Sequence, residues 1–308
     1  MEQKYGEKLT GFLAGAFAYT IWGILPIYWK LIGGVPASEI LAYRILWSFV
    51  FMVLFIAILN KTAETWREIK TIFTHPKTAI LITFAAILIT ANWFIFIFTV
   101  NSGHVTEASL GYYINPLVNV LIATLFLKEK LSYVELTAVL FAIVGVIILT
   151  YHSGHIPFAA IAMAVTFSLY GLIKKFVPVS VFTGLTLETA IIFPFALIYL
   201  VFFAKTFFMS YAFSTDILVA LAGVVTAIPL LLFATAAKRI SYIMVGFLQY
   251  IGPTLMFILG VLFYKEQFDQ VQLIAFLFIW LAIIIFMSAN IMIARKIKRL
   301  EQVNKSLN

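Results

Sequence analysis

Residues 113–129 read Tyr-Ile-Asn-Pro, an apolar run and Leu-Phe-Leu-Lys-Glu, and residues 250–266 read Tyr-Ile-Gly-Pro, an apolar run and Leu-Phe-Tyr-Lys-Glu. Every match falls at an offset of 137 residues, so Pro116 and Pro253 stand at the same place in the two copies. Duplicated apolar segments with proline at matching positions are typical of membrane proteins that build a midmembrane site from two repeats. The duplication therefore predicts a chain made of two related halves.

The composition excludes a soluble protein. Hydrophobic residues make up 63% of the chain, charged residues only 11%, and the mean hydropathy is +1.06; a globular protein needs far more polar surface. Cysteine is absent, which excludes disulfides, thiolate metal ligands and thiol nucleophiles. The net charge of +8 raises the question of nucleic acid. We expect instead that the basic residues sit in loops, as membrane topology demands, and that there is no nucleic-acid partner.

Apolar runs long enough to span a bilayer recur from end to end. The first follows a short polar N-terminus and is too long for a cleaved signal peptide, so we expect it to be a membrane span. The fold class predicted is therefore an all-α integral membrane protein in the lipid bilayer. Its ten transmembrane helices are expected at residues 9–32, 39–59, 77–100, 106–127, 133–150, 156–174, 181–204, 217–237, 242–264 and 270–294.

The distribution of basic residues orients these spans. With the N-terminus inside, 17 of the 21 Lys and Arg residues fall in cytoplasmic segments, 3 fall outside, and 1, Arg44, lies within a span. Such an excess on one side is the signature of cytoplasmic loops. It predicts ten spans with both termini cytoplasmic.

Five spans in each half place the two copies in opposite orientations. The Lys128-Glu129 pair then faces the cytoplasm, whereas Lys265-Glu266 faces outside. The domains predicted are one five-helix repeat over residues 1–152, a second over residues 153–294, and a basic cytoplasmic tail over residues 295–308. Inverted repeats offer two equivalent conformations, one open to each side, and this is the structural basis of alternating access.

Polar side chains within the spans mark a candidate cavity. Four residues spaced by three or four positions share one face of the fourth span: Ser109, Tyr112, Asn115 and Asn119. The offset of 137 maps Tyr112 onto Gln249. We predict cavity contacts by Tyr112, Asn115, Gln249, Tyr250, Asn92 and Trp93, with Thr226 a further polar residue of the eighth span. The alternative is that these groups join helices by hydrogen bonds, and for Asn119 alone we favour that alternative.

The two prolines of the repeat sharpen this prediction. Pro116 and Pro253 lack a backbone N–H, so each frees the carbonyl group of the residue four positions earlier. Such carbonyls are tolerated at membrane depth where a cavity or a neighbouring helix satisfies them. We therefore expect helix kinks at both prolines.

Two ionisable residues lie inside the predicted spans. Arg44 is about one turn from the outer end of its span, and Glu188 is about two turns from the inner end of its own. We interpret both as charge-handling residues, with Arg44 suited to binding an anion or carboxylate and Glu188 to binding a proton or cation. The alternative for Arg44 is that its long side chain snorkels to the interface.

What the sequence lacks also narrows the function. It has no metal-binding or phosphate-binding motif, no Asp within a span, and no complete nucleophile elbow, because residues 107–111 read Glu-Ala-Ser-Leu-Gly without the first glycine. We expect no enzyme activity, no cofactor and no metal. The spans at 133–150 and 270–294 are nearly free of polar groups, so they face lipid or form a homodimer interface.

The sequence resembles the EamA-type transporters of the drug/metabolite transporter superfamily, and within them the RarD branch. The resemblance covers nearly the whole chain and is strongest at residues 22–30, 35–44, 107–119 and 246–257, with further similarity at residues 92–93, 183–189 and 278–280. It implies two inverted five-helix EamA-like repeats in the bacterial inner membrane. The cavity then lies among spans 1–4 and 6–9, with spans 5 and 10 peripheral.

The same resemblance implies a secondary transporter, expected to export a small-molecule metabolite or drug without ATP. If transport is coupled to protons, Glu188 is the expected carrier. One alternative is a passive facilitator without a coupling ion, and another is a membrane protein that transports nothing.

Overall fold

The structure is a computed structural model that describes residues 2–306 except residues 103, 155, 207, 264 and 266–268; side chains are described for residues 6–292 apart from these gaps and residues 101, 105 and 106. In this part the chain forms α-helices and no strand. The helices are α1 (Glu2–Leu31), α2 (Ala37–Ile58), α3 (Thr62–Thr74), α4 (Pro76–Asn101), α5 (Val105–Leu125), α6 (Tyr133–His152), α7 (Phe158–Phe176), α8 (Val181–Phe202), α9 (Phe213–Arg239), α10 (Tyr242–Gln249), α11 (Ile251–Leu262) and α12 (Gln270–Ser306).

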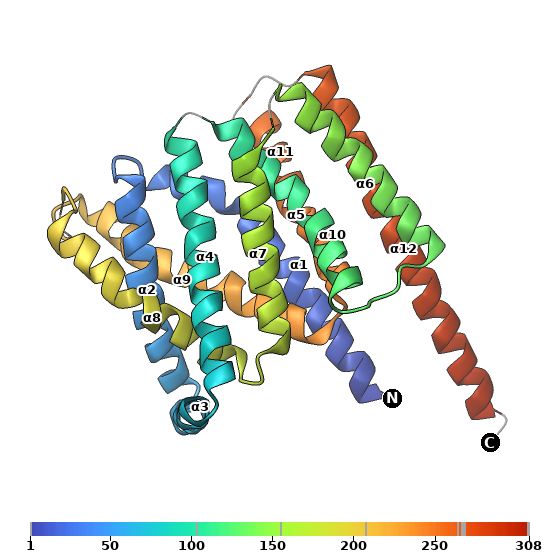
Figure 1. The fold of residues 1–308 in the computed structure, drawn as a ribbon, viewed down its shortest axis with the longest axis horizontal. Coiled ribbons are helices and arrows are strands. Elements are labelled where there is room, and N and C mark those ends of the chain that lie inside the picture. The colour runs from blue at the N-terminus through green and yellow to red at the C-terminus, as the bar shows by residue number, and fades with distance from the viewer. Residues whose placement is uncertain are drawn as a thin grey trace.

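Ten helical segments are long and apolar enough to cross a membrane, which confirms the predicted number of spans and the all-α class. Figure 1 shows them standing side by side as one bundle. The span expected at residues 242–264 is divided at Tyr250 into α10 and α11, three residues before Pro253. Pro116, by contrast, lies within the single helix α5. The two prolines of the repeat therefore have different local outcomes.

Helix α3 was not predicted, because the segment between the second and third spans is polar and short. It is amphipathic and connects α2 to α4. Trp66 and Phe73 are exposed on it, and Glu68 accepts the backbone N–H of Ser180 at 3.0 Å. Exposed aromatic residues on an amphipathic helix are typical of a helix that lies in the membrane interface. Here the helix also ties the α2–α4 connection to the start of α8.

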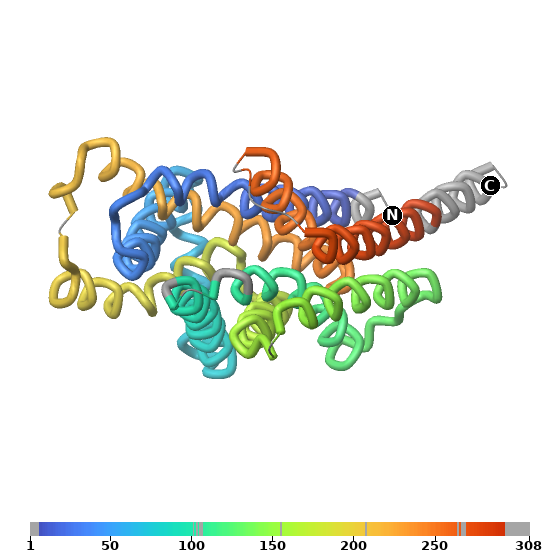
Figure 2. The backbone as a smooth tube through the Cα atoms, turned by 90° about the horizontal axis from the view of Figure 1, so that it is seen from above, coloured from blue at the N-terminus to red at the C-terminus, as the bar shows by residue number. Residues whose placement is uncertain are grey.

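The bundle has two layers, which Figure 2 shows from above: α1, α9, α11 and α12 on one side and α4, α5, α6 and α7 on the other. Across and within the layers, α1 packs on α9, α10 and α11, and α7 packs on α4 and α5. Helices α6 and α12 pack extensively on each other at one end of the bundle. Each layer thus contains helices from both halves of the chain.

In the two copies of the repeated segment, residues 113–129 and 250–266, the helix ends with the same backbone conformation at the positions that the structure describes. Phe126 and Phe263, 137 residues apart, cap α5 and α11 with φ values of −95° and −97°. Lys128 and Lys265 then both adopt the left-handed region, with φ values of 55° and 53°, which non-glycine residues seldom occupy. Glu266 of the second hairpin lies outside the described residues. Equal sequence has here produced equal and unusual backbone geometry.

Glycines allow the close approach of helices where a side chain has no room. A Cβ added to Gly223 of α9 would lie 2.5 Å from the backbone nitrogen of Ser48 and closer still to the backbone of Trp47 in α2. The hydroxyl of Ser48 also donates to the carbonyl oxygen of Gly223 at 3.1 Å. Small residues at such crossings are how membrane helices gain packing area when lipid offers no hydrophobic driving force.

We predict that Gly223→Ala destabilises the protein by about 1–3 kcal/mol, because the rigid main chain of α2 cannot move aside without losing its packing. The matched control is Gly6→Ala: no atom lies within 4 Å of the added Cβ, and alanine favours a helix by up to about 1 kcal/mol over glycine. Melting temperatures in one detergent measure both. An unchanged melting temperature for Gly223→Ala would contradict the close α2–α9 contact.

Candidate functional site

A cavity of about 520 Å³ lies at the centre of the bundle, and most of its wall is apolar or aromatic. Its walls come from α1, α4, α5, α7, α10 and α11, with contributions from α2, α6 and α12. Toward one end of the bundle it reaches Val100, Ser153, Val261 and Gln272, which lie at the ends of their helices. The cavity therefore extends from the middle of the bundle toward the end opposite the start of α1.

Arg44 is the charged residue deepest in this wall. It is the eighth residue of α2, about 10 Å along the helix from its first residue. Its Nε donates to the hydroxyl of Thr226 in α9 at 3.0 Å. Its guanidinium carbon lies 4.7 Å from the ring centroids of both Trp29 and Trp93. Two indole rings and one hydroxyl thus hold the guanidinium at the cavity, where cation–π contacts stabilise it.

Amide side chains line the same cavity from three helices. Asn92 donates to the carbonyl oxygen of Met163 at 2.7 Å and to the hydroxyl of Thr166 at 3.1 Å, which fixes α4 against α7. The oxygen of Asn115 accepts the hydroxyl of Ser168 at 2.9 Å. The Asn115 side chain is held by this bond, which uses its oxygen and leaves its NH2 group without a hydrogen bond to the described residues.

Gln249 belongs to the last turn of α10, just before the break at Tyr250. Its oxygen accepts the amide of Asn119 at 2.8 Å, and both residues are nearly inaccessible to solvent. Asn119 thus joins α5 to α10, whereas the NH2 group of Gln249, whose side chain lines the cavity, makes no hydrogen bond to the described residues. The bond places two residues of the repeated blocks against each other.

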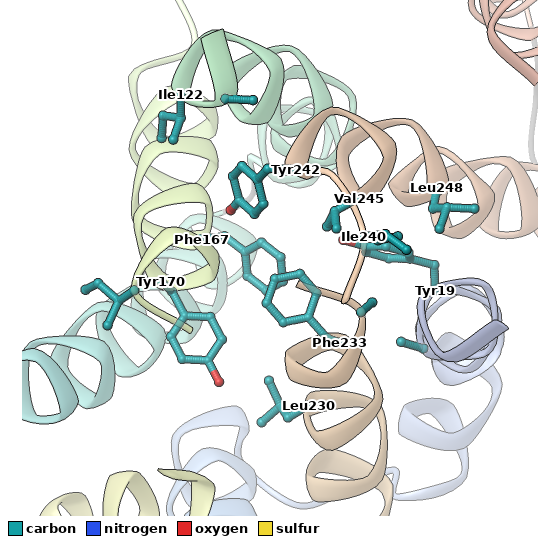
Figure 3. Close-up of a cluster of buried hydrophobic side chains, with 14 of the residues drawn as sticks. Tyr19, Ile122, Phe167, Tyr170, Leu230, Phe233, Ile240, Tyr242, Val245 and Leu248 are labelled. Atoms are coloured by element: carbon teal, nitrogen blue, oxygen red, sulfur yellow. The ribbon is translucent and has the colours of Figure 1, made fainter. Parts of the chain in front are cut away.

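Five aromatic residues close the other end of the cavity. We call Tyr19, Trp22, Phe167, Tyr170 and Phe233 the aromatic plug; its ring centroids are 5.0 Å apart for Phe167 and Phe233 and 5.9 Å apart for the stacked Tyr170 and Phe233. Figure 3 shows the rings of Phe167 and Phe233 side by side between α7 and α9, with Tyr242 beside them. Tyr19, Trp22 and Phe167 also line the cavity. The plug is therefore its floor.

A buried ion pair lies beyond the plug. The Lys174 Nζ is 2.6 Å from the Glu188 Oε1, and the two side chains are 4% and 3% exposed. The hydroxyl of Tyr170, a plug residue, donates to the other carboxylate oxygen at 3.1 Å. Because an unpaired charge at this depth is costly, the pair and the hydroxyl hold α7 and α8 together.

Further charged groups at the same end bind backbone groups of neighbouring segments. Lys175 donates to the carbonyl oxygens of Ala237 and Ile240, at 3.1 and 2.7 Å. Lys238 donates to the carbonyl oxygens of Val177 and Val179. The expectation that basic residues lie in loops is thus wrong for Lys174, Lys175 and Lys238, which belong to α7 and α9. Lys174 is buried, and the half-buried Lys175 and Lys238 bind carbonyl oxygens at the ends of neighbouring helices.

A surface contact between a histidine and a carboxylate marks the rim of the open end. His152 ends α6 and lies 2.7 Å from the carboxylate of Asp269, which precedes α12. Asp269 also accepts the backbone N–H of Gln272 at 2.7 Å, and this bond, with His152 beside it, lowers the pKa of the Asp269 carboxyl. His152 and Gln272 both line the cavity. The rim thus links α6 to α12.

The structure brings together six of the eight residues singled out for the cavity and its charges, and these line one cavity: Tyr112, Asn115, Gln249, Asn92, Trp93 and Arg44. Tyr250 is buried at 1% exposure behind the lining, and Glu188 lies beyond the plug. Sequence reasoning did not find the plug or Lys174. A usable signal existed for Lys174: Tyr170 and Lys174 are four residues apart and so share one helix face.

Comparisons with known proteins find relatives along nearly the whole chain. Residues 9–151 match the EamA-like transporter family. The chain is 44% identical to protein RarD of Salmonella typhi over 93% of its length and 97% of that protein. It is 45% identical to the uncharacterized transporter YojE of Bacillus subtilis over 92% of its length and 95% of that protein.

A chain of known crystal structure shares the fold. The two chains are 21% identical and superpose with a TM-score of 0.68. The match covers 89% of this chain and 96% of the other. At this identity the similarity shows the fold alone.

We predict that Lys174→Met lowers the free energy of unfolding by about 3–5 kcal/mol, because it leaves the Glu188 carboxylate buried without its cation. The double variant Lys174→Met and Glu188→Leu should recover most of this loss, since an apolar pair removes both charges. The matched control is the exposed pair Lys61 and Glu64, 3.8 Å apart, where Lys61→Met should change stability by less than about 1 kcal/mol.

Denaturation in one mixed micelle system gives all of these values. If the single and double variants lose equal stability, the two side chains are not coupled and the buried ion pair is contradicted.

Proposed function

The chain belongs to the RarD branch of the EamA-like transporters, and on this basis we propose that it is a secondary transporter that carries a small organic molecule by alternating access. It is a multi-pass protein of the bacterial inner (cytoplasmic) membrane. Its relatives are named transporters, so membrane transport is the general function, and the mechanism and direction are the proposal's own.

The observation that carries the proposal is the central cavity with one closed end. A volume of about 520 Å³ suits a small-molecule ligand. The aromatic plug closes the cavity toward the start of α1, while helix ends surround its other mouth. A channel would need no such floor, whereas a carrier must keep one side shut while the other is open.

The inverted repeat supplies the second conformation. The two halves are residues 1–152 and 153–294, and the family match to residues 9–151 spans only the first of them. The hairpins at Lys128 and Lys265 share a left-handed backbone. Helix α1 packs on α9, and α7 packs on α4. In both pairs the first span of one half contacts the third span of the other half. These correspondences support a state in which the roles of the two halves are exchanged.

From the excess of basic residues on one side we infer that both termini are cytoplasmic. The plug then lies on the cytoplasmic side, and the conformation described here is open to the outside. In the exchanged conformation the plug separates and the outer mouth closes. An exporter would load its substrate in that second state and release it in this one.

The position of Glu188 bears on coupling. A proton carrier must meet water or substrate during the cycle, yet Glu188 is 3% exposed and paired with Lys174 in this state. We propose that the pair latches the cytoplasmic side shut and separates when that side opens. If protons drive transport, Glu188 takes up its proton only in the inward-open state, where the pair is broken.

A passive facilitator is the alternative that the same cavity allows. It has the same two states but no coupling ion, so uncouplers that collapse the proton gradient would leave accumulation ratios at unity and rates unchanged. A proton-coupled exporter would lose its uphill transport under the same treatment. Flux into inside-out vesicles, with and without an uncoupler, separates the two.

We predict that Asn115→Leu abolishes transport while the protein is still expressed and folded. The substitution removes an amide at the cavity wall and its bond to Ser168, but it leaves an apolar side chain of similar size. The control is Asn290→Leu: Asn290 donates only to its own helix, at the carbonyl oxygen of Phe286. Vesicle flux and a melting curve measure both variants. Loss of expression in Asn115→Leu would instead assign Asn115 to helix packing.

A further inference from the structure

Arg44 gives the cavity an unbalanced charge. Among the described residues that line it there is no other Arg or Lys and no Asp or Glu. The electrostatic neighbours of the guanidinium in the described part of the chain are the hydroxyls of Tyr28 and Tyr112, which are neutral. A cation without a counter-ion at membrane depth is costly, and its retention marks it as functional. The charge that would balance it has to arrive with a ligand.

The geometry of the guanidinium leaves its binding edge open. The only hydrogen bond that it makes to the described residues is from Nε to Thr226, so its two terminal NH2 groups donate to none of those residues. Trp29 and Trp93 hold the guanidinium at 4.7 Å from each ring centroid, which fixes its position without using its N–H groups. A planar fork with free donors matches the two oxygens of a carboxylate.

The other residues of the cavity wall indicate the chemistry of the part of the ligand that does not contact Arg44. Phe96, Tyr112 and Phe257 add aromatic surface to the indole rings around Arg44. The NH2 groups of Asn115 and Gln249 are further donors without protein acceptors in the described residues. The described part of the wall therefore offers one arginine, neutral donors and apolar area, but no carboxylate that could pair with an ammonium group.

We propose that the substrate class is the monoanionic organic carboxylate with an apolar, preferably aromatic, body, whose carboxylate binds the terminal NH2 groups of Arg44. That such a molecule is the transported substrate rests on the proposed function. That it binds at Arg44 does not depend on transport. Cations are repelled by Arg44. Zwitterionic amino acids bring an ammonium group for which the described lining holds no carboxylate, so they should bind more weakly than the matching acid.

Four probes with the same phenylpropyl body test this charge selectivity: 3-phenylpropanoate, 3-phenylpropanamide, 3-phenylpropylamine and phenylalanine. Calorimetry on the full chain in lipid nanodiscs at neutral pH gives their dissociation constants. We expect the carboxylate to bind about tenfold to a hundredfold more tightly than the amide, because charged hydrogen bonds replace neutral ones. The amine and phenylalanine should bind more weakly than the carboxylate.

Variants of Arg44 assign that preference to a residue. Arg44→Gln should weaken carboxylate binding by about tenfold or more and bring it close to amide binding. Arg44→Lys should fall between, because an ammonium keeps the charge but loses the fork. The control Arg67→Gln removes an exposed arginine of α3 that donates within its own helix, and it should leave all four constants unchanged.

The proposal is overturned if the amide, the amine or phenylalanine binds as tightly as the carboxylate, if the carboxylate does not bind at about 10 mM, or if its preference survives in Arg44→Gln. Should Arg44→Gln fail to fold, the ranking in the unmodified protein and the Arg44→Lys constants decide the matter.

Flux of the same probes into proteoliposomes separates this inference from the proposed function. A carboxylate that binds but never crosses contradicts transport and leaves the site standing. An amide or amine that crosses while the carboxylate neither binds nor crosses leaves transport standing and overturns the substrate class.

Discussion

A charge carried into hydrocarbon has to be satisfied by the protein or by what the protein binds, and the structure meets this constraint in two different ways. Lys174 and Glu188 form an ion pair at 2.6 Å, and the hydroxyl of Tyr170 donates to the second carboxylate oxygen of Glu188. Arg44 has only Thr226 and two aromatic faces, and its remaining donors point to no protein acceptor among the described residues. The first arrangement is complete and closes the bundle. In the second arrangement the arginine has donors without protein acceptors among the described residues and lines the cavity. A residue that binds a charged ligand needs such donors.

The packing of the bundle places these two sites at opposite ends of one path. The aromatic plug stands between them, and Tyr170 belongs both to the plug and to the ion pair. Gly171 makes the plug possible, because a Cβ there would lie 2.8 Å from the ring of Phe233. The floor of the cavity and the latch below it are therefore one packed unit, so that opening the cytoplasmic side has to disturb both together.

Membrane physics explains which parts of the fold the sequence could predict. Apolar runs of spanning length yielded the ten spans, and Arg44 was recognisable because a single basic residue stood inside one of them. The same rule misplaced Lys174: basic residues near span ends were assigned to loops, whereas its partner Glu188 comes from another helix and draws it inward. Long-range pairs of this kind leave no local pattern.

Helix α3 escaped prediction for a different reason, since a short amphipathic segment has several local outcomes. Kinks were expected at both prolines, but the sequence did not indicate that the span containing Pro253 would be divided at Tyr250. Pro116 and Pro253 make this plain, because only the second accompanies a division of its helix. Of the residues singled out for the site, most line the cavity, but their individual contacts could not be predicted from the sequence. The amides of Asn92 and Asn119 proved to hold helices together while lining or adjoining the cavity.

The central claim is that the plug opens to the cytoplasm while the outer mouth closes, and the absence of cysteine from the chain allows a direct measurement. Single cysteines would be placed at Ser109, in the cavity wall, and at Ala237, a fully buried residue one turn beyond Phe233 on the same face of α9. A membrane-impermeant thiol reagent would then be added from each side during transport. The account predicts that Ser109→Cys reacts from outside, and that Ala237→Cys reacts from the cytoplasmic side only when substrate is turning over. Continued transport with Ala237→Cys never labelled from the cytoplasmic side would contradict it.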